Sequence, residues 1–320
     1  MTTPYPSYPS YPFDTAATPD IDLATVRSEG RIGIAYSGGG DRIAVHLGIV
    51  RAFIETGIIP QRIAGASAGA FASVFHALDP SATTYLPLAI STVQRALPLL
   101  RPSRLGLVFR LFPSLLKGLL FGAAAIDLQS LNTNDRIKRL LKRRLPIQTF
   151  SQLRVPVSIA ATNLLNGSEA WFEHDDVELI AALLASAAIP GLFPPVKIAN
   201  QFYVDGTIAD NLPLFHLAEQ GCAIIYACNV GFAGQTRTPP RNLLDILIQS
   251  ESIGQFVADT REQEILALRY PQIKVIPVRP QVALDSLPSE IEPEDVPGIV
   301  DTAATETRRI LERAKALPPA

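Results

Sequence analysis

The sequence predicts an α/β fold in which a mostly parallel sheet is sandwiched between helices. Short apolar runs, typical of buried strands, alternate with amphipathic helical patterns along the chain. The first two runs enclose a helix of the length that a right-handed parallel crossover requires. The chain has 320 residues, 48% of them hydrophobic and 18% charged, so it can bury a large core without disulfides.

Residues 31–78 predict a strand, a glycine turn, a helix, a second strand, a sharp turn and a second helix. The three consecutive glycines let the backbone adopt positive φ and leave its N–H groups exposed. Ser67 lies at the sharp turn, between Gly65 and Gly69. The predicted bounds are 32–36 for the first strand, 38–40 for the glycine turn, 43–56 for the helix and 61–64 for the second strand.

Residues 80–150 differ from the rest because they are rich in Leu, interrupted by Pro, and basic. Within them, residues 101–145 carry ten Lys or Arg and only two acidic residues. We expect short amphipathic helices that form a cap or lid over the sheet. Two interpretations stay open, namely simple helical packing and a surface that contacts anionic membrane lipid. Nucleic acid is not favoured, since aromatic or glycine interleaving is absent.

The second half predicts six further strands and four helices, within one domain that spans residues 29–320. The strands are expected at 155–162, 170–173, 196–198, 202–204, 223–228 and 273–278. The third and fourth of these read as a hairpin, and Asp205 and Gly206 follow it at once. The helices are expected at 177–188, 211–221, 241–268 and 298–315.

Residues 1–28 include a Tyr- and Pro-rich run that favours a disordered, unpacked tail. The first twenty residues hold no Lys or Arg and no apolar core, so no signal peptide is predicted. No transmembrane helix is predicted either, because the uncharged stretch 179–196 contains three prolines. Cys222 and Cys228 are too far apart in an extended run to form a disulfide. We expect a cytoplasmic protein that can contact membranes peripherally.

The G-x-S-x-G pattern around Ser67 predicts a nucleophile on a strained strand-to-helix turn. A serine hydroxyl needs a base, and histidine is the usual partner. The order Ser, acid, His fits badly here, because no histidine follows His216 in the last hundred or so residues. Asp205 is the better candidate, since it ends a predicted strand. His46, His76 and His174 are expected to be structural or exposed, and the histidines do not cluster as a metal site would.

A glycine turn between a strand and a helix can also cradle phosphate. The dinucleotide pattern G-x-G-x-x-G is incomplete here, because Ile43 stands where the third glycine belongs, and no Walker lysine is present. Nucleotide binding is therefore disfavoured.

Four motifs in order resemble the patatin-like phospholipase family, over roughly residues 30–230. Each motif alone is modest, but the ordered set is specific. They are the glycine-rich loop Ser37-Gly38-Gly39-Gly40-Asp41-Arg42, the elbow Gly65-Ala66-Ser67-Ala68-Gly69, the proline-bearing segment 185–195, and Val204-Asp205-Gly206 followed by Asn211-Leu212-Pro213.

The resemblance implies a three-layer α/β/α fold and a serine acyl hydrolase of fatty-acyl esters, with a Ser–Asp dyad and no cofactor or metal. Ser67 would attack the acyl carbonyl, and Asp205 would accept its proton. The backbone N–H groups of Gly39 and Gly40 would hold the oxyanion, assisted by the region of Arg42. A lipid or other acyl ester is the implied substrate.

Two positions depart from the family pattern. Ile43 stands where the family has glycine after the basic residue, and this is expected to alter how the loop turns into the helix. Thr207 stands where it has Gly or Ala, and this is expected to crowd Asp205. Neither removes a reacting group. A soluble carboxylesterase with the same dyad and a catalytically impaired lipid-binding protein stay open as alternatives to a lipid hydrolase.

Overall fold

The computed structural model describes residues 30–100, 130, 132–235, 239–240, 243–282 and 291–316. The expected tail 1–28 and most of the segment 101–129 lie outside the described residues. An eight-stranded sheet forms the centre, in the order β5-β6-β3-β2-β1-β7-β8, with β4 paired to β3. The strands are β1 Ile32–Tyr36, β2 Arg62–Ala66, β3 Val157–Asn163, β4 Glu169–Phe172, β5 Val196–Ile198, β6 Gln201–Asp205, β7 Ile224–Cys228 and β8 Lys274–Val278.

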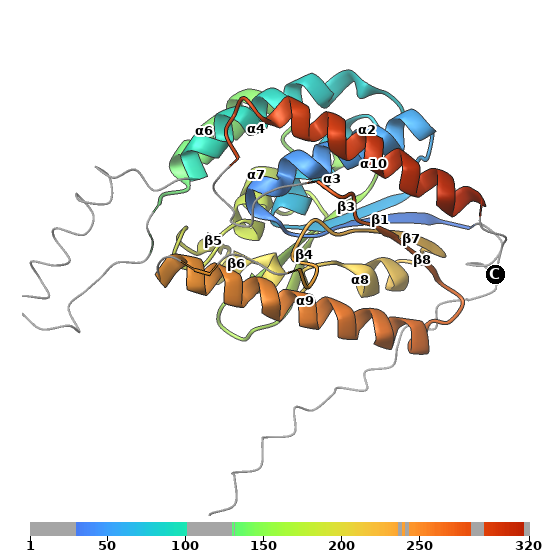
Figure 1. The fold of residues 1–320 in the computed structure, drawn as a ribbon. Coiled ribbons are helices and arrows are strands. Elements are labelled where there is room, and N and C mark those ends of the chain that lie inside the picture. Colours follow the sequence, from blue (N-terminus) through green and yellow to red (C-terminus); the bar gives the residue numbers. More distant parts are fainter. Residues whose placement is uncertain are drawn as a thin grey trace, which may run out of the picture.

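Helices cover both faces of this sheet, as Figure 1 shows. One layer holds α2 Ile43–Thr56, α3 Ala68–Leu78, α4 Leu86–Leu100, α6 Asp135–Arg144, α7 Leu179–Ser186 and α10 Val296–Ala316. The opposite layer holds α8 Leu214–Glu219 and α9 Leu243–Arg269. The pairs β3–β2, β2–β1, β1–β7 and β7–β8 are parallel. The predicted three-layer α/β/α fold with a mostly parallel sheet is therefore confirmed.

The sheet separates two apolar cores, because successive side chains of a strand point to opposite faces. In β1, Ile34 and Tyr36 join the large core under α2, α3 and α10. Ala35 between them joins a smaller core under α8 and α9. Burial on both faces explains why the central strands read as continuous apolar runs in the sequence.

The helix α2 begins and ends where its sequence pattern indicates. Gly57 follows it in the left-handed conformation, with φ of 69°, which glycine tolerates best. Near its middle, α2 meets α10 at very short range. A Cβ added at Gly48 would lie 2.5 Å from the Cβ of Ala303 and 2.6 Å from the carbonyl oxygen of Val300. The helix α10 is thus seated directly on α2.

The described parts of residues 80–150 extend the layer that contains α2. Ala89, Val93 and Leu97 of α4 are buried, as are Ile137 and Leu141 of α6, and all five belong to the large core. Short 3₁₀ turns complete the elements that matter for the site, namely Gly40–Arg42 and Gly206–Ile208. The wider cap or lid stays a prediction, since residues 101–129 are not described.

The register of β3 brings two strand ends together. β2 runs parallel to β3 and stops with Ala66 opposite Ala160. β6 runs antiparallel to β3 and stops with Asp205 opposite Ala161. β4 pairs with both of these β3 residues and so occupies the other side of β3. β2 and β6 therefore approach each other head-on along one side of β3, and their last residues meet.

Candidate active site

Ser67 occupies a strained turn directly after β2. Its φ of 50° and ψ of −119° are rare for a residue with a side chain. The flanking glycines permit the turn, because a Cβ at Gly65 would lie 2.4 Å from the carbonyl oxygen of Gly69. A Cβ at Gly69 would lie 2.2 Å from the carbonyl oxygen of Tyr36. The predicted elbow thus has a steric cause at both glycines.

The strained turn is held from α7. The Ser67 amide donates to the Ser186 hydroxyl at 2.9 Å, and both residues are buried. Ser186 lies within the proline-bearing segment quoted above, yet the sequence gives no sign of this bond. An amide and a hydroxyl 119 residues apart can be paired only once the register of the sheet is known.

Asp205 lies at the end of β6 and faces the serine. The Ser67 hydroxyl donates to Oδ2 of Asp205 at 2.8 Å. The carboxyl group is 1% exposed, and the serine is 4% exposed. Burial raises the pKa of Asp205 to about 7, although hydrogen bonds from Thr207 and Ser67 oppose this rise. The structure therefore brings together the two residues that the sequence singles out as nucleophile and base.

Thr207 supports Asp205 rather than simply crowding it. Its amide and its hydroxyl both donate to Oδ1 of Asp205, at 3.0 and 2.9 Å. Its methyl group packs against the glycine loop, where a Cβ at Gly38 would lie 2.1 Å from Cγ2 of Thr207. Next to it, a Cβ at Gly206 would lie 2.4 Å from the carbonyl oxygen of Ala160. Both glycines are therefore needed for close packing beside the carboxylate.

The glycine loop follows β1 and has one amide fixed and two available. The Gly38 amide points to Asn211, 3.2 Å from its side-chain oxygen and 3.3 Å from its carbonyl oxygen. Within the described part of the chain, the amides of Gly39 and Gly40 have no hydrogen-bond acceptor. Ile43 has an ordinary helical φ of −50° where α2 begins, so this position places no demand for glycine.

Arg42 ties the glycine loop to the segment after β7. Its guanidinium donates to the carbonyl oxygen of Val230 at 2.8 Å, and burial lowers its pKa. The Val230 amide in turn donates to the Ser37 hydroxyl at 3.1 Å. These contacts give Arg42 a place in shaping the loop, while its predicted assistance to the oxyanion stays a prediction.

A buried carboxyl group on α9 supports the glycine loop and the segment after β7 through two asparagine side chains. Oδ2 of Asp259 accepts hydrogen bonds from the side-chain amides of Asn211 at 2.8 Å and Asn229 at 2.7 Å. Asn211 then receives the Gly38 amide, and Asn229 receives the Gly231 amide at 2.8 Å. Asp259 could not be singled out from the sequence, because a single acid within a long helical pattern belongs to no motif.

The histidines lie away from the serine hydroxyl. His46 bonds the Ser37 carbonyl at 2.8 Å, and His76 bonds the Tyr36 hydroxyl at 3.0 Å. Burial lowers their pKa values to about 4 and about 3, so both are neutral near pH 7. His216 stacks on Trp171, with ring centroids 3.8 Å apart, and the side chain of His174 is exposed.

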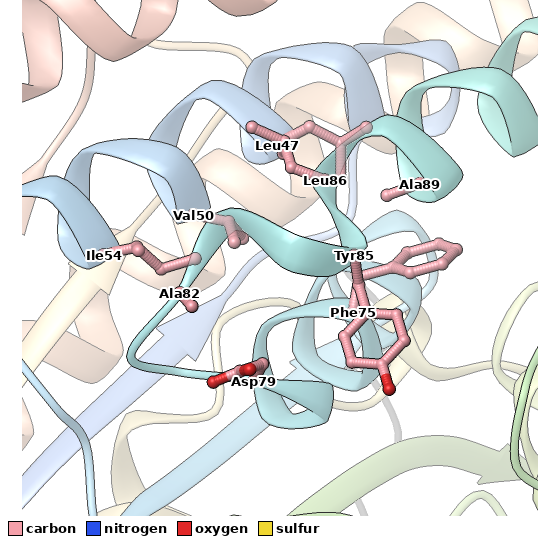
Figure 2. Close-up of a pocket in the computed structure, with 9 residues that line it drawn as sticks. All are labelled: Leu47, Val50, Ile54, Phe75, Asp79, Ala82, Tyr85, Leu86 and Ala89. Atoms are coloured by element: carbon pink, nitrogen blue, oxygen red, sulfur yellow. The ribbon is translucent and has the colours of Figure 1, made fainter.

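A small hollow elsewhere in the fold does not contribute to the site. It lies among α2, the end of α3 and the start of α4, as Figure 2 shows. Its lining is apolar except for Tyr85 and Asp79, and Asp79 is paired with Arg154 at 2.9 Å. Neither Ser67 nor Asp205 lines it.

Comparison with known sequences identifies a family. A model of patatin-like phospholipases matches residues 34–218. An uncharacterized NTE family protein of Mycobacterium tuberculosis (strain ATCC 25618 / H37Rv) is 30% identical over 221 residues, which are 68% of this chain and 54% of the relative. Lysophospholipase NTE1 of Saccharomyces cerevisiae is 26% identical over 219 residues, 68% of this chain and 12% of the relative. The chain thus spans about half or less of the length of these curated relatives.

Comparison with solved structures gives weaker likenesses. The crystal structure of VipD from Legionella pneumophila has a TM-score of 0.43 at 15% identity and covers 89% of this chain and 67% of that chain. The type III effector protein ExoU has a TM-score of 0.38 at 15% identity and covers 90% and 54%. The fold assignment rests on the strand order of this chain and on the family match.

Proposed function

The chain belongs to the patatin-like phospholipase family, and we propose that it is a serine acyl hydrolase that cleaves fatty-acyl esters of lipids. The observation that carries the proposal is the 2.8 Å hydrogen bond from the Ser67 hydroxyl to a buried Asp205 carboxylate oxygen. A serine becomes nucleophilic when an adjacent base takes its proton, and Asp205 is in contact with that proton.

The first half of the proposed reaction forms an acyl-enzyme. Asp205 accepts the hydroxyl proton while Oγ of Ser67 attacks the acyl carbonyl carbon. The resulting oxyanion is received by the amides of Gly39 and Gly40, whose availability supports this role. Losing one such donor raises a barrier by about 3 kcal/mol in known hydrolases. When the intermediate collapses, the alcohol leaves with the proton from Asp205, and the acyl group stays on Ser67.

The second half uses water as the nucleophile. Asp205 accepts a proton from the water molecule as it attacks the acyl-enzyme, and the same amides hold the second oxyanion. Collapse releases the fatty acid and returns the proton to Ser67. A base works best when its pKa lies near the working pH, and burial places the pKa of Asp205 at about 7.

The substrate class follows from the relatives and is part of the proposal. One curated relative is named a lysophospholipase, which favours a phospholipid-derived ester. For the basic segment 101–145, contact with anionic lipid and simple helical packing both stay open, and α6 is its main described element. Among the described residues, no helix combines the length and apolar character needed to cross a membrane.

The test measures fatty-acid release from mixed phospholipid vesicles, with Ser67→Ala as the blank. Ser91→Ala, a partly buried serine on α4, is the matched control and should keep full activity. A fluorophosphonate probe should label the parent chain and not Ser67→Ala. Hydrolysis of short-chain esters alone would point to a soluble carboxylesterase. Absence of both hydrolysis and labelling would reject the enzyme and leave a lipid-binding protein.

A further inference from the structure

The long helix α9 turns its apolar side outward. Between residues 246 and 258, its exposed positions carry no charge at all. They are Ile246, Leu247, Ser250, Ile253, Gly254, Val257 and Ala258. A surface helix of a soluble protein normally shows the opposite pattern, with charged residues outside and an apolar stripe toward the core.

The inward side of α9 is correspondingly polar. Asp245 and Asp259 are buried, and Glu251 and Glu262 are half-buried. Of the side chains described in α9, only Leu266 belongs to the apolar core beneath the helix. The hydrogen bonds of Asp259 to Asn211 and Asn229 fix which side faces the sheet. The outward apolar side therefore cannot be buried by rotating the helix in place.

Most of the large exposed apolar side chains of the described residues lie on α9 and on the elements around β6. Eleven such side chains are exposed, and one of them, Ile59, lies in the loop before β2. Four lie in the turn after β3, in β6 and in the 3₁₀ turn after Asp205, namely Leu164, Leu165, Phe202 and Ile208. The other six lie on α9, namely Ile246, Leu247, Ile253, Val257, Ile265 and Leu268. Patches of this kind mark interaction surfaces.

This surface borders the proposed active site. Ile208 is three residues from Asp205, and the Leu164 amide donates to the Phe202 carbonyl at 2.8 Å. The inward residue Asp259 of α9 reaches Asn211 of the glycine-loop support. Figure 1 shows α9 on the outside of the layer that contains α8, opposite α2 and α10. The apolar outer side of α9 thus faces away from the sheet, on a helix whose inward side contacts the support of the glycine loop.

We propose that the lipid-docking face, defined as Ile246, Leu247, Ile253 and Val257 of α9 together with Phe202 and Ile208, seats the protein on a phospholipid bilayer. The proposal rests on the lipid acyl hydrolase function proposed above. A bilayer fits because the face is uncharged, is built from several separate elements, and borders a site that must receive an acyl chain.

The margin of the face carries exposed cations that suit lipid phosphates. The Lys197 ammonium lies 5.8 Å from the centre of the Phe202 ring. Arg261 is exposed four residues after Val257, about one helical turn from the face. Basic residues beside an apolar helix face are typical of helices that lie in the membrane interface.

Membrane contact through α9 is an alternative to membrane contact through the basic helix α6. These helices lie in opposite layers of the fold, as Figure 1 shows. One flat bilayer therefore cannot lie against both of their outer sides. Substitutions in the two helices distinguish the lipid-docking face from the basic segment 101–145 as the membrane contact.

The experiment measures co-sedimentation of the full chain with phosphatidylcholine vesicles that contain about one-fifth phosphatidylglycerol. Ser67→Ala serves as the background, so that hydrolysis does not alter the vesicles. The double variant Ile253→Asp, Val257→Asp should lower the vesicle affinity at least about tenfold, since two apolar side chains would no longer enter the interface. Ile59→Asp is the matched control, because Ile59 is 47% exposed and Ile253 is 49% exposed.

Unchanged vesicle affinity of the double variant would overturn the proposal. So would a loss of binding confined to the α6 variant Arg139→Glu, Arg143→Glu. A further overturning result is a parent dimer that the double variant dissociates while vesicle binding stays intact, since a second copy would then cover the face. In the active chain, the double variant should hydrolyse soluble short-chain esters normally. Vesicle binding by a parent that hydrolyses no ester would reject the proposed function alone.

Discussion

At the scale of single residues, the basicity of Asp205 is a balance of opposed effects. Burial raises its pKa, because a carboxylate loses hydration in an apolar surrounding. The Thr207 amide, the Ser67 hydroxyl and the Thr207 hydroxyl lower it, because each donates to the ionised form. The resulting pKa of about 7 places the carboxyl group where small changes in its partners change its protonation at neutral pH.

Removing the Thr207 hydroxyl should shift this balance upward. In Thr207→Val the carboxylate loses one donor worth about 1 kcal/mol, so the pKa of Asp205 should rise by roughly half to one unit. The acid limb of kcat/KM, expected near pH 7 in the parent, should move to higher pH by that amount. Thr207→Ser keeps the hydroxyl donor, so the acid limb of its kcat/KM profile should stay at the pH of the parent. An acid limb of kcat/KM at the same pH in Thr207→Val as in the parent would contradict this account of Asp205.

Neutralising Asp205 should stabilise the fold while it abolishes turnover. A carboxyl group with a raised native pKa gives most stability below its unfolded pKa, and that stability is lost as pH rises toward 7. Asp205→Asn should therefore raise the free energy of unfolding at pH 8 by on the order of 2–4 kcal/mol. Denaturant unfolding at pH 8 and pH 4 measures this, and the gain should be confined to the higher pH. Equal gains at both values would contradict it.

The motif residues of the site could be predicted from sequence, but their supports could not. Ser67 and Asp205 sit in local patterns with a steric cause, since neighbouring glycines make room for each turn. Ser186 and Asp259 act through contacts with residues far away in the sequence. No local pattern reports such a contact, because it depends on the register and packing of whole elements.

At the scale of elements, α7 supports the turn at which β2 passes into α3. The only side chain of α7 that bonds the turn is Ser186, within the described residues. Its hydroxyl accepts a hydrogen bond from the amide of Ser67, whose φ is positive and whose backbone is therefore strained. The bond keeps a buried amide satisfied and fixes the direction of the serine side chain.

Ser186→Ala should leave that amide without an acceptor. The loss should lower the free energy of unfolding by about 1–3 kcal/mol. It should also lower kcat, because the elbow can then relax away from its strained geometry. Ser158→Ala is a matched control, since Ser158 is equally buried and bonds Glu173 at 2.8 Å outside the elbow. Comparable losses of kcat in both variants would contradict a specific role for Ser186.

The helices and strands lie close to the positions predicted from the sequence, whereas the direction of β6 in the sheet was not predicted. The helix predicted at 43–56 has those bounds, and the predicted hairpin forms β5 and β6. The antiparallel pairing of β6 with β3 interrupts the strand–helix alternation and was not predicted. A strand has the same apolar pattern in either direction, so its pairing must come from the tertiary fold.

At the scale of the whole molecule, α10, from the C-terminal part of the chain, packs against α2, from its N-terminal part. The packing depends on Gly48, whose missing side chain admits the backbone of α10 at Val300. The two helices lie in the layer opposite α9, away from the lipid-docking face (Figure 1). This contact therefore concerns stability, and the chemistry of Ser67 should not depend on it directly.

Gly48→Ala should force α2 and α10 apart. Overpacking of this kind lowers the free energy of unfolding by about 1–3 kcal/mol. The kcat of the remaining folded protein should be unchanged. Gly254→Ala is the matched control in α9, because a Cβ there meets nothing within 4 Å and helix propensity favours alanine by up to about 1 kcal/mol. Chemical denaturation of both variants measures the difference, and equal stabilities would contradict the close contact.

Because β2 and β6 meet head-on along β3, Ser67 and Asp205 come together only late in the synthesis and folding of the chain. Ser67 and Asp205 are 138 residues apart in the sequence, and β2 and β6 share no ladder but meet at their ends along β3, with which both pair. A growing polypeptide that has completed its first crossover already possesses the elbow, yet its serine has no base. In the proposed mechanism, the serine gains its base only when the later hairpin pairs with β3 beyond the end of β2. Under the proposed mechanism, a newly made chain therefore cannot hydrolyse an ester before residues 196–205 have joined the sheet.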